Sequence, residues 1–156
     1  MMLIRAATPD DVPHVLPMVA RICALHESWD APRFRTRQHP EQMYDSWLRD
    51  RATDSRGVFL IAEVGTGIIG YIVGTIEVEV PIYWTPECGW LHDLWVEENY
   101  RNEGVGKQLA MQAVERFKEL GMTQVRLQTA AMNESARALF TTCGFRTSTI
   151  EMLVEV

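Results

Sequence analysis

The chain has 156 residues, of which 47% are hydrophobic and 23% charged, a composition typical of one soluble globular domain with a substantial core. Its net charge of -6 argues against a nucleic-acid partner, because proteins that bind nucleic acid present a basic face to the phosphates. The three cysteines, Cys23, Cys88 and Cys143, are odd in number and lack zinc-ligand spacing, so we expect no metal site, no disulfide framework and a reducing, cytoplasmic environment.

The first fifty residues predict one strand and two helices. Residues 3–7 form a short strand candidate, and Thr8-Pro9 then begins a helix that carries apolar residues at helical spacing to about residue 27. Residues 26–39 are mixed and polar, and Pro40 begins a second helix. No long apolar run follows a basic start, and no apolar run reaches the length of a membrane span. We therefore expect no signal peptide and no membrane partner.

The middle of the chain predicts an antiparallel hairpin. Two apolar runs, 58–64 and 68–80, are separated by the turn residues Gly65-Thr66-Gly67. Gly70 and Gly74 lie inside the second run, where a glycine marks a bulge or a close packing contact.

A strand, a glycine-containing loop and a helix form the centre of the sequence. The strand is predicted over 90–96, and the helix begins near Val105 with apolar residues at spacings of three, four and one. Between them lies the loop 101–106, which contains Gly104 and Gly106. Glycines at a helix start leave the first N–H groups open, and these groups with the helix dipole form a site suited to a phosphate.

The remaining residues predict a strand at 124–129, a helix at 133–144 that ends at Gly144, and a strand at 149–156 with alternating apolar residues. The order of elements indicates one mixed α/β sheet with helices on both faces. We see no linker or repeat and expect a single domain over residues 1–156.

Two blocks of the sequence are similar to the motifs of one enzyme family. Residues 91–109 read Leu-x-Asp-Leu-x-Val-x-x-x-Tyr-Arg-x-x-Gly-Val-Gly-x-x-Leu, and residues 127–145 contain an Asn, an Ala, a Phe and a terminal Gly-Phe. This pattern resembles the GNAT superfamily of N-acetyltransferases. The resemblance implies a mostly antiparallel mixed sheet with a splayed central parallel strand pair, and acetyl-CoA as the acyl donor.

The resemblance also implies which residues bind coenzyme A. Backbone groups of the central strand would pair with the pantetheine arm, the loop would hold the pyrophosphate, and the second block would contact the rest of the arm. The residues at these positions are Leu94, Trp95, Val96, Arg101, Asn102, Glu103, Gly104, Val105, Gly106, Lys107, Asn133, Ala136 and Phe140.

His92 and Asp93 are the candidate catalytic residues. Acetyl transfer needs a base that takes a proton from the amine, and a histidine suits this role near neutral pH. Strand alternation predicts that His92 shares a face with Leu94, opposite Asp93. The alternative role of His92 is that of a packed structural histidine, and Asp93 is the alternative base or a carboxylate that orients a loop or the histidine. Phe140 departs from the family pattern, because many relatives have a tyrosine there that protonates the thiolate.

The acceptor is expected to be a primary amine of a small molecule, peptide or protein. The segments that usually line the acceptor cleft contribute His26, Glu27, Trp29, Phe34, Tyr83, Trp84 and Glu87, whose alternative role is simple packing. A non-catalytic acyl-CoA-binding sensor or regulatory module is the alternative function, because Phe140 lacks a proton donor. A family tendency and the C-terminal strand predict a homodimer.

Overall fold

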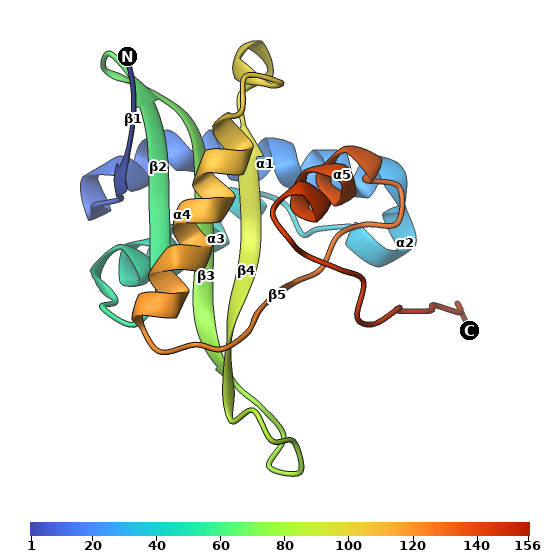
Figure 1. The fold of residues 1–156 in the computed structure, drawn as a ribbon. Helices are drawn as coiled ribbons and strands as arrows, with labels where there is room; N and C mark the ends of the chain where they lie inside the picture. Colours follow the sequence, from blue (N-terminus) through green and yellow to red (C-terminus); the bar gives the residue numbers. More distant parts are fainter.

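A computed structural model describes the whole chain, residues 1–156, as a five-stranded sheet with helices on both faces (Figure 1). The strands follow chain order across the sheet: β1 (Met2–Ala6), β2 (Val58–Val64), β3 (Gly67–Val78), β4 (Glu87–Val96) and β5 (Val125–Leu127). The first four strands are antiparallel to their neighbours, whereas β4 and β5 run parallel. The mixed sheet that the sequence predicts is therefore confirmed.

The helices divide the molecule into two cores. They are η1 (Pro9–Asp11), α1 (Val12–Trp29), α2 (Ala31–Phe34), α3 (Pro40–Thr53), η2 (Glu98–Tyr100), α4 (Val105–Glu119) and α5 (Glu134–Thr142). Helices α1 and α3 pack on one face of the sheet, and α4 with α5 packs on the other (Figure 1). None of these helices combines the length and the apolar character needed to cross a membrane.

Glycines in the sheet allow α4 to approach closely. A Cβ atom on Gly89 would lie 2.6 Å from the ring of Phe117, and one on Gly74 would lie 2.9 Å from the same ring. Phe117 is fully buried in α4. The close packing expected at Gly74 is thus present, and it seats the helix directly on the central strands.

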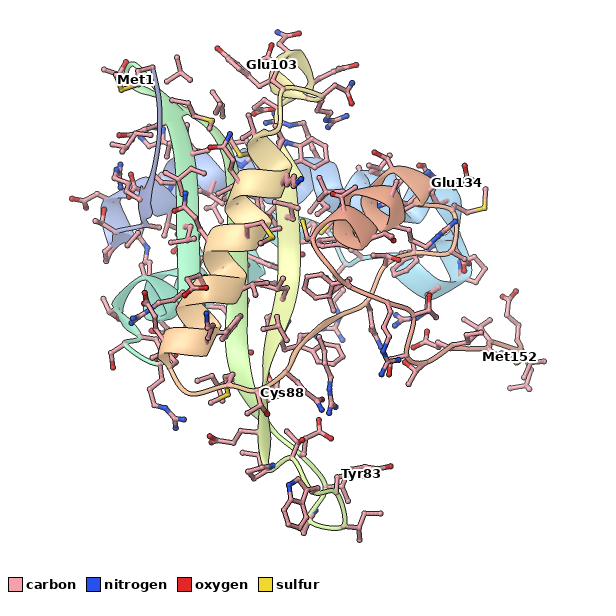
Figure 2. All side chains as sticks on the ribbon, viewed as in Figure 1. Met1, Tyr83, Cys88, Glu103, Glu134 and Met152 are labelled. Atoms are coloured by element: carbon pink, nitrogen blue, oxygen red, sulfur yellow. The ribbon has the colours of Figure 1, made fainter.

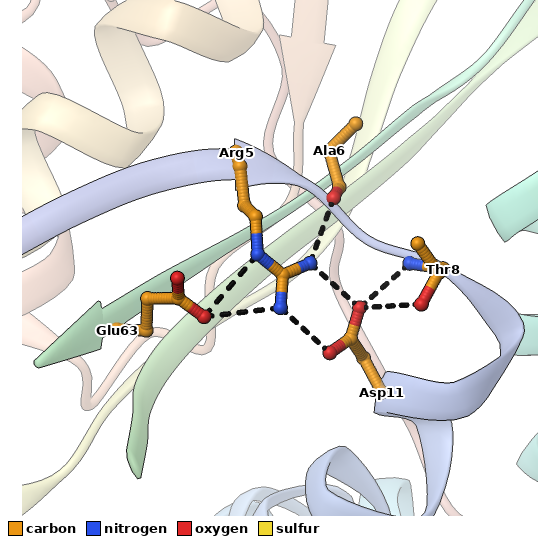
Figure 3. Close-up of polar contacts among 5 residues, drawn as sticks. All are labelled: Arg5, Ala6, Thr8, Asp11 and Glu63. Carbon is orange, nitrogen blue, oxygen red and sulfur yellow. Dashed lines mark hydrogen bonds and ion pairs between the residues drawn. The ribbon is translucent and has the colours of Figure 1, made fainter. Parts of the chain in front are cut away.

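An ion network joins the N-terminal strand to the start of α1 (Figure 3). The Arg5 guanidinium donates to both carboxylate oxygens of Asp11, at 2.8 and 2.9 Å, and to Glu63 on β2 at 3.0 Å. Asp11 also accepts from the backbone N–H and the hydroxyl of Thr8. Hydrogen bonds from Arg5 hold the pKa of the Asp11 carboxyl well below its usual range, despite its burial.

The predicted C-terminal strand is wrong. Residues 145–156 form no regular element and extend away from the sheet, with Met152 near the end of the tail (Figure 2). A strand exists only where another backbone satisfies its N–H and C=O groups, and a single chain brings no such partner to this segment. The tail is held by an ion pair of 2.6 Å between Glu151 and Arg33. Other boundaries shift slightly: α1 begins after one 3-10 turn, and the polar stretch contains the short helix α2.

Candidate active site

Strands β4 and β5 diverge and leave one edge of β4 open. The two strands pair only from Gly89 to Leu91, opposite Val125 to Leu127. Beyond Leu91, β4 continues to Val96 with β3 as its only strand partner. A cavity of about 70 Å³ lies at this divergence, which we call the β4–β5 cavity. The splayed strand pair implied by the resemblance is therefore present, and the β4 backbone beyond Leu91 has no strand partner on this side.

The β4–β5 cavity is lined by four elements. Strand β4 contributes four residues, β5 and the loop after it contribute three, α1 contributes two, and α5 with its N-cap contributes three: Leu91, His92, Asp93, Leu94, Leu127, Gln128, Thr129, Ile22, His26, Asn133, Ala136 and Phe140. Both candidate catalytic residues and the residues of the second motif thus meet here, although they lie about forty positions apart in the sequence.

A β-bulge in β4 corrects the predicted orientation of His92. Val73 pairs with Asp93, whereas Gly74 pairs with Leu91, so His92 is the extra residue of the bulge. Leu94 packs with the α4 core, but the His92 ring meets Trp47 of α3 edge-on, with ring centroids 5.4 Å apart. His92 therefore does not share a face with Leu94. Strict alternation fails because the bulge inserts one residue into the pleat.

The His92 side chain makes one hydrogen bond within the chain, between its Nε2 atom and the Thr75 hydroxyl, at 2.7 Å. Thr75 in turn donates to Glu77 at 2.6 Å, and Glu77 Oε1 lies 3.8 Å from Nε2. Burial lowers the pKa of His92, Arg51 lowers it further, and Glu77 opposes both effects. The imidazole is therefore mainly neutral at pH 7, as a base must be.

Asp93 lies on the same side of the sheet, near Tyr44 of α3 and Cys23 of α1. Its Oδ2 atom is buried and has no hydrogen-bond partner. Burial raises the pKa of Asp93 to about 6, while the Tyr44 hydroxyl acts to lower it. A buried carboxylate with an unused oxygen beside a cavity is poised to receive a proton or a positively charged group.

The N-terminus of α4 is open, as the glycine loop predicts. Gly104 is the residue before the helix and has a φ of 82°, in the left-handed region that favours glycine. No side chain caps this end, and the first backbone hydrogen bond of the helix is donated by the Gln108 N–H to the Gly104 carbonyl. Asn102 also has a positive φ of 64°, so the loop turns sharply before the helix begins. The first N–H groups of α4 therefore have no side-chain acceptor, which is the arrangement that suits an anion.

Several cofactor-site candidates have contacts of their own. The Arg101 Nε donates to the Val96 carbonyl at 2.9 Å, and its guanidinium lies over the Trp95 ring, so that charge is held beside the end of β4. Asn133 begins α5, where its side-chain oxygen accepts from Ala136 N–H at 3.1 Å. Its amide nitrogen is left without a partner in the chain. The buried Phe140 ring forms part of the cavity wall and contacts Phe145 edge-on.

The segments predicted to line the acceptor cleft are only partly brought together. His26 packs against Trp29 and Phe34, with ring centroids 5.6 and 5.1 Å away, and it also borders the β4–β5 cavity. Tyr83 and Trp84 instead are exposed and lie in the turn between β3 and β4, where Figure 2 shows Tyr83 at the tip of the hairpin. These two aromatic residues do not line the β4–β5 cavity.

Sequence reasoning missed the α3 and β3 residues that surround His92. Trp47 contacts the ring, and Thr75 and Glu77 lie on one face of β3. One signal was available: Thr75 is a single polar residue within the apolar run of residues 68–76, and such a residue must find hydrogen-bond partners when buried.

Comparisons with known proteins show the family and the fold of this chain. A model of the acetyltransferase (GNAT) family matches residues 23–145. The uncharacterized N-acetyltransferase YvbK of Bacillus subtilis is 30% identical over 66 residues, a match that covers 42% of this chain and 43% of that protein, so the aligned part spans less than half of the relative.

Two solved structures share the fold over nearly the full length of both chains. A point mutant of the BH1408 protein of Bacillus halodurans has a TM-score of 0.85 at 20% identity and covers 99% of each chain. A predicted acetyltransferase from Clostridium acetobutylicum, solved with acetyl-CoA, has a TM-score of 0.80 at 16% identity and covers 99% of this chain and 96% of that one. The chain belongs to the GNAT family of acetyltransferases.

Proposed function

We propose that this chain is an acetyl-CoA-dependent N-acetyltransferase that moves the acetyl group to a primary amine by direct attack. The observation that carries the proposal is the open inner edge of β4, which has His92 and Asp93 beside it and leads to the uncapped start of α4. One short segment thus offers backbone groups for an extended amide chain, an anion site for phosphates and a base.

The binding residues follow from this arrangement. Backbone groups of Leu94 to Val96 would pair with the pantetheine amides, as an added strand would. The loop from Arg101 to Lys107 would hold the pyrophosphate through the N–H groups of α4. The Asn133 amide, together with Ala136 and Phe140, would border the arm near the thioester. A backbone N–H near Leu94 would then stabilise the oxyanion of the attacked carbonyl.

The reaction needs no covalent enzyme intermediate. His92 takes one proton from the amine while the amine nitrogen bonds to the acetyl carbon, and Asp93 is the alternative base. The C–S bond breaks, and its electron pair leaves on sulfur. Phe140 has no proton to give, so water or the substrate's own nitrogen protonates the thiolate, which with a Cys-like pKa near ~8.5 is an acceptable leaving group.

Release of coenzyme A thiol from acetyl-CoA, measured with a broad panel of primary amines, tests this function. We expect amine-dependent release in the wild type and a kcat lower by roughly 10²-fold in His92→Ala. His39→Ala, which alters an exposed histidine, is the matched control and should leave the rate unchanged. Tight coenzyme A binding without turnover for any amine would favour the sensor or regulatory module.

We also propose that the protein is a homodimer that works in the cytoplasm. The exposed tail carries Ile150, Met152 and Val154, each more than 80% exposed, and β5 forms an open edge of the sheet. Exposed apolar residues beside an unpaired strand edge favour pairing with a second copy. All three cysteines are free, which suits a reducing compartment.

A further inference from the structure

Resting on the proposed function, we propose that Thr75 and Glu77 of β3 are positioning residues that hold His92 as its Nε2–H tautomer, so that Nδ1 is the atom that accepts the proton of the amine. Neither residue belongs to a motif that the sequence singles out, and both reach His92 only because β3 pairs with β4.

The hydrogen-bond chain determines the direction of each bond. Glu77 is half exposed and carries a carboxylate, which only accepts, so the 2.6 Å contact requires the Thr75 hydroxyl to donate to it. The single hydroxyl proton of Thr75 is then used. The Thr75 oxygen must therefore accept from His92 at 2.7 Å, and this places the proton on Nε2.

The fold brings the three members of this chain of bonds together. Thr75 and Glu77 are two residues apart and so point to the same side of β3. Thr75 is only 7% exposed, with its backbone in the centre of the sheet. The bulge directs His92 toward them, and Trp47 packs edge-on against the imidazole ring. The Thr75 hydroxyl and the Trp47 ring thus both orient the imidazole, and Nδ1 makes no hydrogen bond within the chain.

The charges around the ring suit a base that becomes cationic. Glu77 on β3 is the carboxylate nearest to Nε2, and Asp93 follows His92 on β4. Arg51 on α3 opposes the cation, and His26 of α1 borders the same cavity. When Nδ1 accepts a proton, the new positive charge spreads to Nε2–H, and Glu77 stabilises it through Thr75. This arrangement is analogous to a serine, histidine and carboxylate triad in which a carboxylate orients and stabilises the imidazolium.

The proton balance is complete without another reactant. The amine nitrogen forms the C–N bond, the C–S bond breaks with its electron pair on sulfur, and one N–H proton moves to Nδ1. The proton then leaves Nδ1 for water or for the thiolate, and His92 returns to the neutral Nε2–H form. The proton on Nε2 never leaves the ring, so Thr75 and Glu77 orient the base and transfer no proton themselves.

Nitrogen-15 NMR of the four histidines tests the tautomer without any enzymatic turnover. With the His92 signals assigned from His92→Gln, we expect an Nε2–H imidazole at high pH in the wild type and a mixture of tautomers in Thr75→Val. Thr75→Ser, which keeps the hydroxyl, should restore the Nε2–H form. An Nδ1–H imidazole in the wild type would overturn the proposal whatever the enzymatic activity is.

Kinetics with the acceptor found in the amine screen supply the second readout. We expect Thr75→Val to lower kcat on the order of 10-fold or more, with the KM for acetyl-CoA unchanged and with partial recovery in Thr75→Ser. Glu77→Gln should move the acid inflection of kcat to lower pH, because the carboxylate raises the pKa of His92. Glu115→Gln, on the outer surface of α4, is the charge control.

The two proposals fail in different ways. If the wild type shows the expected tautomer but acetylates no amine, the hydrogen-bond chain is supported and the proposed function is refuted. If the enzyme is active but neither its pH profile nor the His92 tautomer changes in Thr75→Val and Glu77→Gln, the function is supported and the positioning role is refuted. If Thr75→Val does not fold, Glu77→Gln still tests the positioning role, because Glu77 is half exposed and its substitution should not prevent folding. The NMR titration of His92 and the pH profile of this variant are then the two measurements.

Discussion

At the scale of single residues, burial favours the neutral form of both His92 and Asp93. It lowers the pKa of His92 and raises the pKa of Asp93 to about 6. Near pH 7 the imidazole is thus a free base, and the carboxylate is ionised at a cost to the folded state. The ionised Asp93 therefore lowers the stability of the folded state, as functional groups in active sites often do.

Asp93→Asn should stabilise the protein at neutral and alkaline pH. The pKa of Asp93 in the folded state, about 6, exceeds the unfolded value near ~3.9, so ionisation destabilises the fold increasingly from about pH 4 to pH 6 and by a constant amount above. Urea unfolding should show a gain of about 1 to 3 kcal/mol at pH 8 that vanishes near pH 4. The exposed Asp50→Asn is the control, and a gain independent of pH would contradict this account of Asp93.

Phe140→Tyr tests whether delivery of a proton to sulfur limits turnover. The ring borders the β4–β5 cavity, so an added hydroxyl would lie near the place proposed for the thioester. We expect kcat to rise severalfold at alkaline pH, where other proton donors become scarce, with little change in coenzyme A affinity. A large fall in kcat at unchanged affinity would instead indicate that Phe140 shapes the acceptor site.

At the scale of elements, the N-terminus of α4 depends on the left-handed Gly104. Gly104→Val should raise the Kd for coenzyme A at least tenfold, or about 1.4 kcal/mol, because the side chain strains the loop that orients the N–H groups. Gly121 follows the other end of α4 with a similar φ of 86°, so Gly121→Val is a matched control for strain. Calorimetry should show normal affinity in that variant, and equal losses in both would refute the phosphate role of the loop.

At the scale of the whole molecule, the tail from residue 149 to residue 156 has exposed apolar side chains and no backbone partner. It has the alternating apolar pattern of a strand, and no other backbone pairs with it. Within the proposed homodimer this segment pairs with, or packs against, a second copy, so that its apolar residues leave the water. The open edge at β5 offers one such place.

Sedimentation at micromolar concentration should give twice the 17.8 kDa mass of one chain. Met152→Asp should shift the protein to the monomer, because a charge would be buried in the interface, while coenzyme A affinity stays unchanged. Glu155→Gln, on the alternate face of the same segment, is the control. A monomeric wild type would contradict the dimer and leave the tail as an exposed terminus.

The sequence by itself determined the family and most of the elements, but not the short helix α2 or the structure of the C-terminal tail. The 58–64 strand, the helix from Val105 and the glycine loop are local patterns, set by side-chain periodicity and by the backbone freedom of Gly104. The two motifs that carry the resemblance are each contiguous in the sequence, so no contact between distant segments was needed to find them.

Only the tertiary structure decided how the site is assembled. The bulge that turns His92 toward α3 arises from the register of β3 on β4, and one inserted residue reverses what alternation predicts. Strand pairing and helix packing bring Thr75, Glu77 and Trp47 to the imidazole. The residues adjacent to His92 in the sequence predict neither of these contacts. The tail illustrates the opposite case, in which a local pattern predicts a strand that does not form. Its alternating residues cannot form a strand unless a second backbone supplies the hydrogen bonds.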